Sequence, residues 1–333
     1  PDIKINNGGQ ELQIISSTVN DSGMYECLAS NAAGNDQMII DLRVWVPPSI
    51  DEANIVDNPR VVINRTVLLE CPVDGVPPPT VEWQRNGEPL VIEKGTELLA
   101  DGKHLQLTRV QVSHTARYTC IASNTAGQLT KNFDLEVLVP PTFIGQSRTE
   151  IIEVVQNRSA YLQCSTEGVP APSIMWLKGS TPLLDFPYTN MREMGNGRRL
   201  ELRNVQIEDE GTFTCRATNV AGQNDKQFRL KVHVPPRING EREVMELSVI
   251  VRRPIRFECE ATGQPQPSIN WLKDGREISP EAFQNMRIAD AGKVLQIISA
   301  QSGDTGSYTC SAENVAGRTN KRYSLQVHCK YFK

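Results

Sequence analysis

Apolar and polar residues alternate along many short stretches of this chain. The clearest stretches are residues 67–71, 105–110, 160–164, 200–205 and 295–300. An alternation of this kind places every second side chain in a core and the others in water, as in a half-buried strand. No segment shows the apolar spacing of an amphipathic helix. The pattern therefore predicts an all-β protein made of short strands.

The same pattern returns about every 95 residues, which indicates an internal repeat. One cysteine marks each repeat, with separations of 93, 95 and 95 residues between Cys27, Cys120, Cys215 and Cys310. An aromatic residue stands two positions before each of them, namely Tyr25, Tyr118, Phe213 and Tyr308. An Asn-x-Ala-Gly tag follows each of them, at 31–34, 124–127, 219–222 and 314–317. Proline pairs predict the boundaries between repeats, at 47–48, 140–141 and 235–236.

The earlier half of each complete repeat carries a second cysteine, with a tryptophan twelve positions after it. These residues are Cys71 and Trp83, Cys164 and Trp176, and Cys259 and Trp271. A Gly-x-Pro-x-Pro turn lies between them, at 75–79, 168–172 and 263–267. Asn-Gly at 86–87 and Asp-Gly at 274–275 favour hairpin turns, because these residues tolerate positive φ.

These features resemble the immunoglobulin I-set domain, a sandwich of two sheets with a Cys…Trp…Cys spacing and an aromatic residue two positions before the second cysteine. Among I-set arrays the chain is most similar to the hemicentin family, whose modules also meet at Val-Pro-Pro junctions. The resemblance implies three disulfides, each with a tryptophan packed on it: Cys71–Cys120, Cys164–Cys215 and Cys259–Cys310. It also implies a tyrosine corner in each repeat except at Phe213, which has no hydroxyl group.

The repeats predict tandem immunoglobulin-like β-sandwiches in an extended rod. The predicted divisions are 1–46 for the C-terminal half of a truncated module, 47–139, 140–234 and 235–328 for I-set modules, and 329–333 for a divergent tail. The repeat places the partner of Cys27 about 50 residues before Cys27, which is upstream of Pro1. Cys329 has no counterpart in the other repeats. We expect both thiols to be unpaired in this segment.

The composition is that of an ordinary globular protein and argues against several function classes. The 35 Lys and Arg against 39 Asp and Glu give a net charge of −4, without the cationic face that nucleic acid requires. No apolar stretch is long enough for a membrane span in this segment. The four histidines are scattered, and no metal-binding spacing, phosphate loop or nucleophile elbow is present. We therefore expect neither an enzyme nor a cofactor.

The repeats also suggest charged pairs near the aromatic corner. An aspartate precedes the corner aromatic in every repeat except the second, at 47–139, and a basic residue lies 17 positions before each aspartate. This spacing predicts the ion pairs Lys4–Asp21, Arg192–Asp209 and Arg287–Asp304. The module at 47–139 exchanges both members, which predicts an inverted pair between Glu97 and protonated His114. Such a pair would stabilise that module at mildly acid pH; the alternative is two unrelated surface substitutions.

Asn-x-Ser/Thr glycosylation sequences occur at Asn20, Asn64 and Asn157. Asn64 and Asn157 share one position of the repeat, seven residues before a cysteine, where an exposed turn is expected. We predict glycans there, with Asn20 as a third candidate. Arginines cluster at 192, 198, 199 and 203 and at 252, 253 and 256. They suit either a heparan-type glycan or a solvated sheet face balanced by Glu201 or Glu258.

Stiff junctions and paired cysteines lead to a prediction of function. Consecutive prolines favour extended connections, and three complete cysteine pairs favour an oxidising, extracellular compartment. We predict a cell-adhesion or matrix-recognition segment that binds other cell-surface or matrix proteins, including immunoglobulin domains of like molecules, through repeated weak contacts. The alternatives are the ectodomain of a neuronal recognition or axon-guidance receptor, the non-catalytic region of a peroxidasin-like matrix peroxidase, and a cytoskeletal array.

Overall fold

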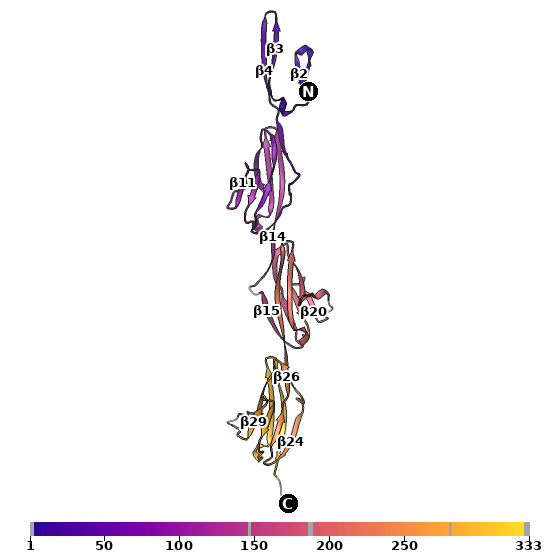
Figure 1. Cartoon of the computed structure of the whole chain (residues 1–333), viewed down its shortest axis with the longest axis vertical. Coiled ribbons are helices and arrows are strands. Elements are labelled where there is room, and N and C mark those ends of the chain that lie inside the picture. Colours follow the sequence, from indigo (N-terminus) through magenta and orange to yellow (C-terminus); the bar gives the residue numbers. More distant parts are fainter. Residues whose placement is uncertain (1–2, 146–147, 186–188, 280–281, 330–333) are drawn as a thin grey trace. The chain divides into compact units, whose positions relative to one another are not determined.

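The computed structural model describes residues 3–145, 148–185, 189–279 and 282–329 (Figure 1). This part of the chain consists of β-strands, turns and short 3₁₀ segments, without an α-helix. The predicted all-β class is therefore confirmed. The chain divides into two compact units. The first comprises Pro1–Pro140, Gly168–Pro170 and Asn219–Gly222, and the second Pro141–Glu167, Ala171–Thr218 and Gln223–Lys333.

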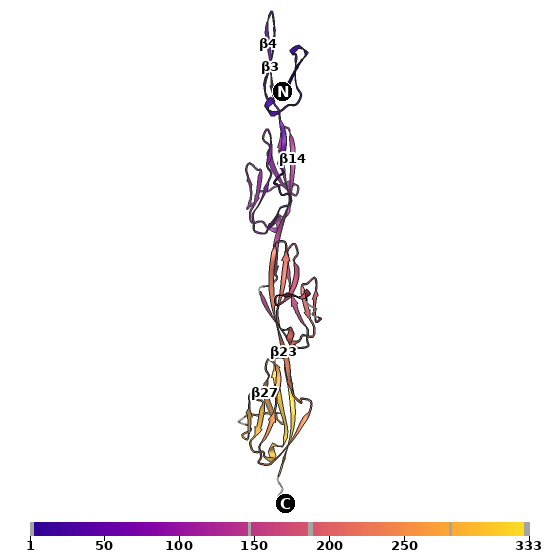
Figure 2. The ribbon, with the colours of Figure 1, turned by 45° about the vertical axis from the view of Figure 1, so that its right-hand side comes forward.

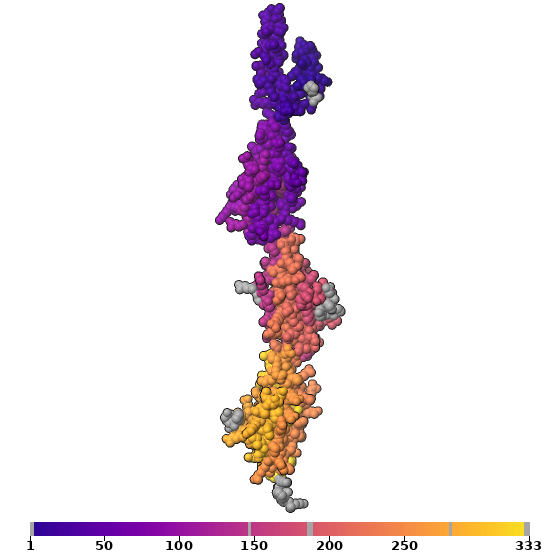
Figure 3. Space-filling model, in the orientation of Figure 1, coloured from indigo at the N-terminus to yellow at the C-terminus, as the bar shows by residue number. Residues whose placement is uncertain are grey.

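The first unit begins with two hairpins that carry no core. The elements are β1 (Ile3–Asn6), η1 (Asn7–Gly9), β2 (Glu11–Ile14), η2 (Val19–Asp21), β3 (Gly23–Asn31) and β4 (Gly34–Leu42). β1 pairs with β2 and β3 with β4, and the two hairpins stand as separate projections (Figure 3). No residue from 3 to 46 is buried. Because isolated two-stranded hairpins are marginally stable, this segment lacks the packing of the rest of the unit.

The remainder of the first unit is a two-sheet sandwich. Its elements are β5 (Val46–Ile50), β6 (Arg60–Val62), β7 (Val67–Glu70), β8 (Val73–Val76), β9 (Thr80–Arg85), β10 (Glu88–Pro89), β11 (Thr96–Leu99), β12 (His104–Leu107), η3 (Val112–His114), β13 (Ala116–Asn124) and β14 (Gly127–Phe143). One sheet has the order β11–β12–β7 and the other contains β10–β9–β13–β14. β6 runs parallel to β14, and β5 pairs with β8. We call this sandwich module 2.

The second unit holds two sandwiches of the same kind, which we call modules 3 and 4 (Figure 2). Module 3 contains β15 (Thr149–Val155), β16 (Ala160–Gln163), β17 (Thr166–Val169), β18 (Ser173–Lys178), β19 (Thr181–Pro182), η4 (Leu183–Asp185), β20 (Met191–Met194), β21 (Arg199–Leu202), η5 (Ile207–Asp209), β22 (Gly211–Asn219) and β23 (Gly222–Ile238). Module 4 contains β24 (Val244–Ile250), β25 (Ile255–Glu258), β26 (Ala261–Gln264), β27 (Ser268–Lys273), β28 (Arg276–Glu277), β29 (Met286–Ala289), β30 (Val294–Ile297), η6 (Ser302–Asp304), β31 (Gly306–Asn314) and β32 (Gly317–His328).

In each of these modules a three-stranded sheet packs on a larger one. The three-stranded sheets are β16–β21–β20 and β25–β30–β29, and the larger sheets are β15–β23–β22–β18–β19 and β24–β32–β31–β27–β28. β23 serves two sheets, because its residues 227–233 pair with β15, whereas its last residues, including Val234 and Ile238, pair with β26. The proline pair 235–236 thus lies inside a continuous strand.

A disulfide and a tryptophan form the centre of each core. The three predicted disulfides are present, with Cα–Cα distances of 6.5 Å for Cys71–Cys120, 6.3 Å for Cys164–Cys215 and 6.3 Å for Cys259–Cys310. Trp83, Trp176 and Trp271 are buried, as predicted. Their indole N–H groups donate at 2.7, 2.6 and 2.7 Å to the carbonyl oxygens of Gly102, Gly197 and Gly292. This bond ties the core to the turn before the middle strand of the three-stranded sheet.

The tyrosine corner is formed wherever the sequence supplies a tyrosine. The hydroxyl groups of Tyr25, Tyr118 and Tyr308 donate to the carbonyl oxygen four residues upstream at 2.8, 3.2 and 2.8 Å. Burial raises the pKa of Tyr118 and of Tyr308, so both hydroxyls stay protonated donors. Phe213 is fully buried at the same position. The third module thus keeps the packing of this corner without its hydrogen bond.

Two parts of the sequence-based description stay predictions. The division at 46, 139, 234 and 328 is one, because the chain separates into two compact units rather than five segments. The extended rod is the other, because it depends on how the units are placed. Residues 330–333 of the predicted tail lie outside the described residues.

Candidate interaction surface

The aspartate at the corner of module 3 faces the backbone rather than its predicted basic partner. Asp209 Oδ2 accepts hydrogen bonds from Gln206 N at 2.9 Å and from Asn190 Nδ2 at 2.8 Å. Arg192 lies opposite Glu201 in the sheet instead. Among the described residues no ion pair joins Arg192 to Asp209, and the predicted pair is wrong.

Module 4 repeats this arrangement. Asp304 Oδ2 accepts from Gln301 N at 2.8 Å and from Asn285 Nδ2 at 2.9 Å. Arg287 lies opposite Gln296 on the exposed side of β29, so the predicted Arg287–Asp304 pair is also wrong. Both aspartates are only 8% exposed, and neutral amide donors satisfy them without burying a second charge.

The N-terminal hairpin segment has a corner of the same type. Asp21 Oδ2 accepts from Thr18 N at 2.7 Å and from Thr18 Oγ1 at 2.9 Å. The backbone hydrogen bond from Thr18, together with its hydroxyl, holds the pKa of Asp21 below the ordinary value. Lys4 is exposed on β1 and makes no ion pair with Asp21 in the described chain, which corrects the third prediction.

His114 occupies the aspartate position of module 2 and acts as an acceptor. Its Nδ1 accepts a hydrogen bond from Gln111 N at 2.9 Å. A nitrogen can accept only when it is unprotonated, so the bond requires neutral imidazole. Glu97 lies opposite Gln106 on the exposed side of β11. The predicted pair of Glu97 with protonated His114 is therefore wrong.

The corner acceptor nevertheless changes together with a second residue, which is the asparagine donor and not the predicted basic residue. Asn190 and Asn285 each lie 19 positions before the corner aspartate, and Gly95 lies 19 positions before His114. The asparagine donor is thus absent where the carboxylate acceptor is absent. Comparing this position among the repeats would have identified the true partner, but the spacing of charged residues alone does not.

The asparagine of the Asn-x-Ala-Gly tag holds together the N-terminal end of each module, a role that the sequence did not reveal. In module 2, Asn124 Nδ2 donates to the carbonyl oxygens of Val46 at 2.8 Å and Pro77 at 2.9 Å. Asn314 Nδ2 makes the same two bonds to Val234 and Pro265, both at 2.8 Å. We call this contact the asparagine clamp.

The clamp explains the glycine of the Gly-x-Pro-x-Pro turn. A Cβ atom on Gly75 would lie 3.1 Å from Asn124 Nδ2 and 3.2 Å from the Val46 oxygen. Gly263 has the same distances to Asn314 Nδ2 and the Val234 oxygen. Two motifs far apart in the sequence therefore form one structural contact.

The outer face of the β9–β13–β14 sheet is the candidate interaction surface. Its exposed or half-buried residues are Thr80, Glu82, Gln84, Arg117, Thr119, Ile121, Ser123, Gln128, Thr130, Asn132 and Asp134. They form rows across the sheet, because alternate residues of a strand point to one side. We call this surface the polar face of module 2.

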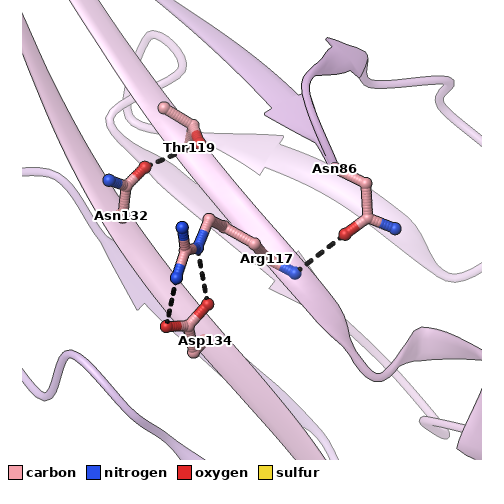
Figure 4. Close-up of polar contacts among 5 residues, drawn as sticks. All are labelled: Asn86, Arg117, Thr119, Asn132 and Asp134. Atoms are coloured by element: carbon pink, nitrogen blue, oxygen red, sulfur yellow. Dashed lines mark hydrogen bonds and ion pairs between the residues drawn. The ribbon is translucent and has the colours of Figure 1, made fainter.

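Side chains on the polar face satisfy one another (Figure 4). Arg117 Nε and Nη2 donate to the two carboxylate oxygens of Asp134 at 2.7 and 3.0 Å. This contact raises the pKa of Arg117 and lowers that of Asp134, so both stay charged. Thr119 Oγ1 lies 2.8 Å from Asn132 Oδ1, and Arg117 N donates to Asn86 Oδ1 at 3.1 Å. The face is thus fixed in shape, and of its three charged residues Glu82 has no ion-pair partner in the described chain.

The glycosylation candidates lie on two kinds of turn. Asn64 and Asn157 are exposed, with φ of 66° and 65°, and their Oδ1 atoms accept from Gln111 Nε2 and Gln206 Nε2 at 2.9 Å each. The Nδ2 atom that a glycan would modify makes no hydrogen bond in the described chain. Asn20 lies within η2, which is a different setting.

Features for other chemistry are sparse in the described part of the chain. Cys27 and Cys329 are exposed and unpaired there, as predicted. No cluster of three or more His, Cys, Asp or Glu residues that could hold a metal ion occurs among the described residues. None of their elements is a helix with the length and apolar character needed to cross a membrane.

Comparison with known proteins agrees with this architecture. The immunoglobulin I-set domain family matches residues 53–137, 141–232 and 241–327. Hemicentin-1 of Mus musculus is 40% identical over 331 residues, which are 98% of this chain and 6% of that protein. Roundabout homolog 2 of Homo sapiens is 31% identical over 332 residues, which are 96% of this chain and 23% of that protein. The chain spans only a small part of either relative.

A solved structure shows the same kind of array. The N-terminal eight immunoglobulin domains of Down Syndrome Cell Adhesion Molecule align with a TM-score of 0.62 and 25% identity, covering 95% of this chain and 41% of that one. Family matches over three segments, two-sheet topology and one disulfide in each sandwich all agree. The chain belongs to the immunoglobulin I-set domain family.

Proposed function

We propose that this chain is an extracellular segment that binds other proteins in cell–cell or cell–matrix adhesion. The polar face of module 2 is the observation that carries the proposal. Its arginine is neutralised by Asp134, and Ile121 lies between Thr130 and Glu82 at its centre. A surface with one unpaired charge among polar and apolar side chains costs less to desolvate than a densely charged one, since the centres of protein interfaces are depleted in charged residues.

The disulfides and the relatives support this proposal. A bridge in each of the three modules suits an oxidising compartment. The related proteins include one whose name describes a cell adhesion molecule. The ectodomain of a neuronal recognition or axon-guidance receptor is a second candidate for the function. The similarity to Roundabout homolog 2, which is 31% identical over most of the chain, favours it. A membrane span in the continuous coding sequence would distinguish the second candidate from a matrix protein.

Bead binding tests the proposal. Residues 1–333, secreted from eukaryotic cells and coupled to beads, should bind cultured cells and the matrix that they deposit, as well as beads carrying the same chain if like molecules are partners. Prior trypsin treatment of the cell and matrix surface should abolish binding, because the partner is a protein. Beads that bind no surface, or that bind equally after trypsin treatment, would overturn the proposal.

A further inference from the structure

Three arginines lie on the outer side of the three-stranded sheet of module 3. Arg192 is on β20, Arg199 is on β21 and Arg203 follows the end of β21; all three are exposed. Arg199, Glu201 and Arg203 alternate along the chain and therefore form one row, and Arg192 lies opposite Glu201. We call the three arginines the basic face of module 3.

Neighbouring side chains hold this face in place. The guanidinium carbon of Arg199 lies 4.1 Å from the centre of the Tyr161 ring, a stacking distance for a cation on an aromatic ring. The Tyr161 hydroxyl donates to Glu201 Oε1 at 3.2 Å, and Arg203 Nη2 lies 2.8 Å from Glu201 Oε2. Arg199 and Arg203 are thus oriented before any ligand arrives, which lowers the entropic cost of binding.

Glu201 holds Arg203 and Tyr161 in place and does not neutralise the whole positive charge of the basic face. The hydrogen bond from Arg203, followed by its charge, holds the pKa of Glu201 below the ordinary value. The glutamate is 8% exposed, whereas the Arg203 side chain is 58% exposed. Arg192 and Arg199 form no ion pair within 4 Å in the described chain. Three arginines against one carboxylate leave two net positive charges on the face.

The other modules do not carry this network. Module 2 has Glu97, His104 and Thr108 at the positions of the three arginines, and module 4 has Arg287, Val294 and Ile298. Tyr161 is replaced by Leu68 and Arg256, so neither module has an aromatic ring at this position. The basic face is a property of module 3 within an otherwise acidic chain of net charge −4.

We propose that the basic face of module 3 binds a sulfated polysaccharide chain. Exposed guanidinium groups in a row match the regularly spaced anionic groups of such a chain, and each can make paired hydrogen bonds to an oxyanion. The inference goes beyond protein recognition but rests on the proposed extracellular placement, where such chains occur. Binding would add a second, non-protein contact to the same segment.

Affinity for a heparin decasaccharide tests the inference. Residues 1–333 should bind it at about 150 mM NaCl, and Arg192→Gln with Arg199→Gln should weaken binding by about tenfold or more. The slope of log K against the logarithm of the NaCl concentration should become shallower by about one to two, because fewer counterions are released on binding. Arg199→Lys should weaken binding less, since it keeps the charge but loses the planar stacking on Tyr161.

A matched control lies on the other sheet of the same module. Arg216→Gln with Arg229→Gln removes the same charge from β22 and β23 and should leave heparin affinity within about twofold, a difference below about 0.4 kcal/mol. Absence of heparin binding, an equal loss in this control, or equal affinity for unsulfated hyaluronan would each overturn the inference. If heparin binding fails in one of these ways while trypsin-sensitive bead binding to cells and matrix survives in the Arg192/Arg199 variant, this inference is overturned and the proposed function stands.

Discussion

At the scale of single residues, the 3₁₀ corners differ in the chemistry of one hydrogen-bond acceptor. Asp21, Asp209 and Asp304 offer a carboxylate oxygen to the backbone, and His114 offers Nδ1. A carboxylate offers two acceptor oxygens, whereas a neutral imidazole offers one acceptor nitrogen. Among the described corners, that of module 2 therefore depends on a single acceptor atom.

Removal of this acceptor should loosen the corner. His114→Ala leaves the Gln111 amide without its acceptor, and exchange of that amide should rise by about fivefold, as expected for a cap of about 1 kcal/mol. Hydrogen-exchange mass spectrometry of the peptide containing Gln111 measures this effect.

The same chain supplies the control for the corner. The peptide containing Gln301, whose acceptor is Asp304, should exchange at an unchanged rate in His114→Ala. His114→Asp should keep the protection at Gln111, because aspartate is the acceptor in the other corners. If His114→Ala leaves exchange at Gln111 unchanged, the acceptor role of His114 is contradicted.

Glycan attachment is a second prediction at this scale. The exposed Nδ2 atoms of Asn64 and Asn157 should carry N-linked glycans in the secreted chain, since both asparagines stand on open turns. Asn64→Gln and Asn157→Gln should each remove one glycan, measured as the mass released by a peptide N-glycosidase. Arg252 has the same turn conformation in module 4, with φ of 69°, and its peptide provides an unmodified reference. Unmodified Asn64 and Asn157 peptides would refute this prediction.

At the scale of elements, repeated motifs were predictable and side-chain direction was not. Comparing the repeats revealed the recurring cysteines, tryptophans and corner aromatics, and their resemblance to the I-set domain implied the disulfides, the core tryptophans and the tyrosine corner. The ion-pair predictions were wrong because the residue beside the corner in module 3 is Asn190, just before β20. Arg192 lies two residues farther along the strand, which is about 6.6 Å from Asn190 at strand spacing. The clamp was missed because its donor and acceptors lie 78 and 47 residues apart.

Removing the clamp donor should weaken the N-terminal end of module 2. Asn124→Asp keeps the acceptor for Ala126 N and Gly127 N but leaves two carbonyl oxygens without their donor, which costs about 1–3 kcal/mol. Amide exchange in β8 should rise accordingly. Asn31 bonds only to its own turn, through Ala33 N and Gly34 N, so Asn31→Asp is the matched control and should change nothing in β8. Equal exchange in both variants would contradict the clamp.

At the scale of the whole molecule, one sandwich is repeated with different outer faces. Module 2 presents a polar face with its arginine neutralised, and module 3 presents a basic face on which Arg199 and Arg203 are oriented by a tyrosine and a glutamate. The cores are alike because each has a disulfide, a tryptophan and an aromatic corner residue at the same positions. Recognition therefore depends on surface residues that vary between repeats, and the internal comparison that revealed the fold reveals little about the partner.

The most direct test of the account places a charge at the centre of the polar face of module 2. Ile121→Asp should lower bead binding to cells and matrix by about tenfold or more, corresponding to about 1.4 kcal/mol, because the new carboxylate lies opposite Glu82 and has no cationic partner on the face. Leu68→Asp introduces the same charge on the outer side of the opposite sheet and should leave binding within about twofold. Undiminished binding of Ile121→Asp, or an equal loss in Leu68→Asp, would contradict recognition through this face.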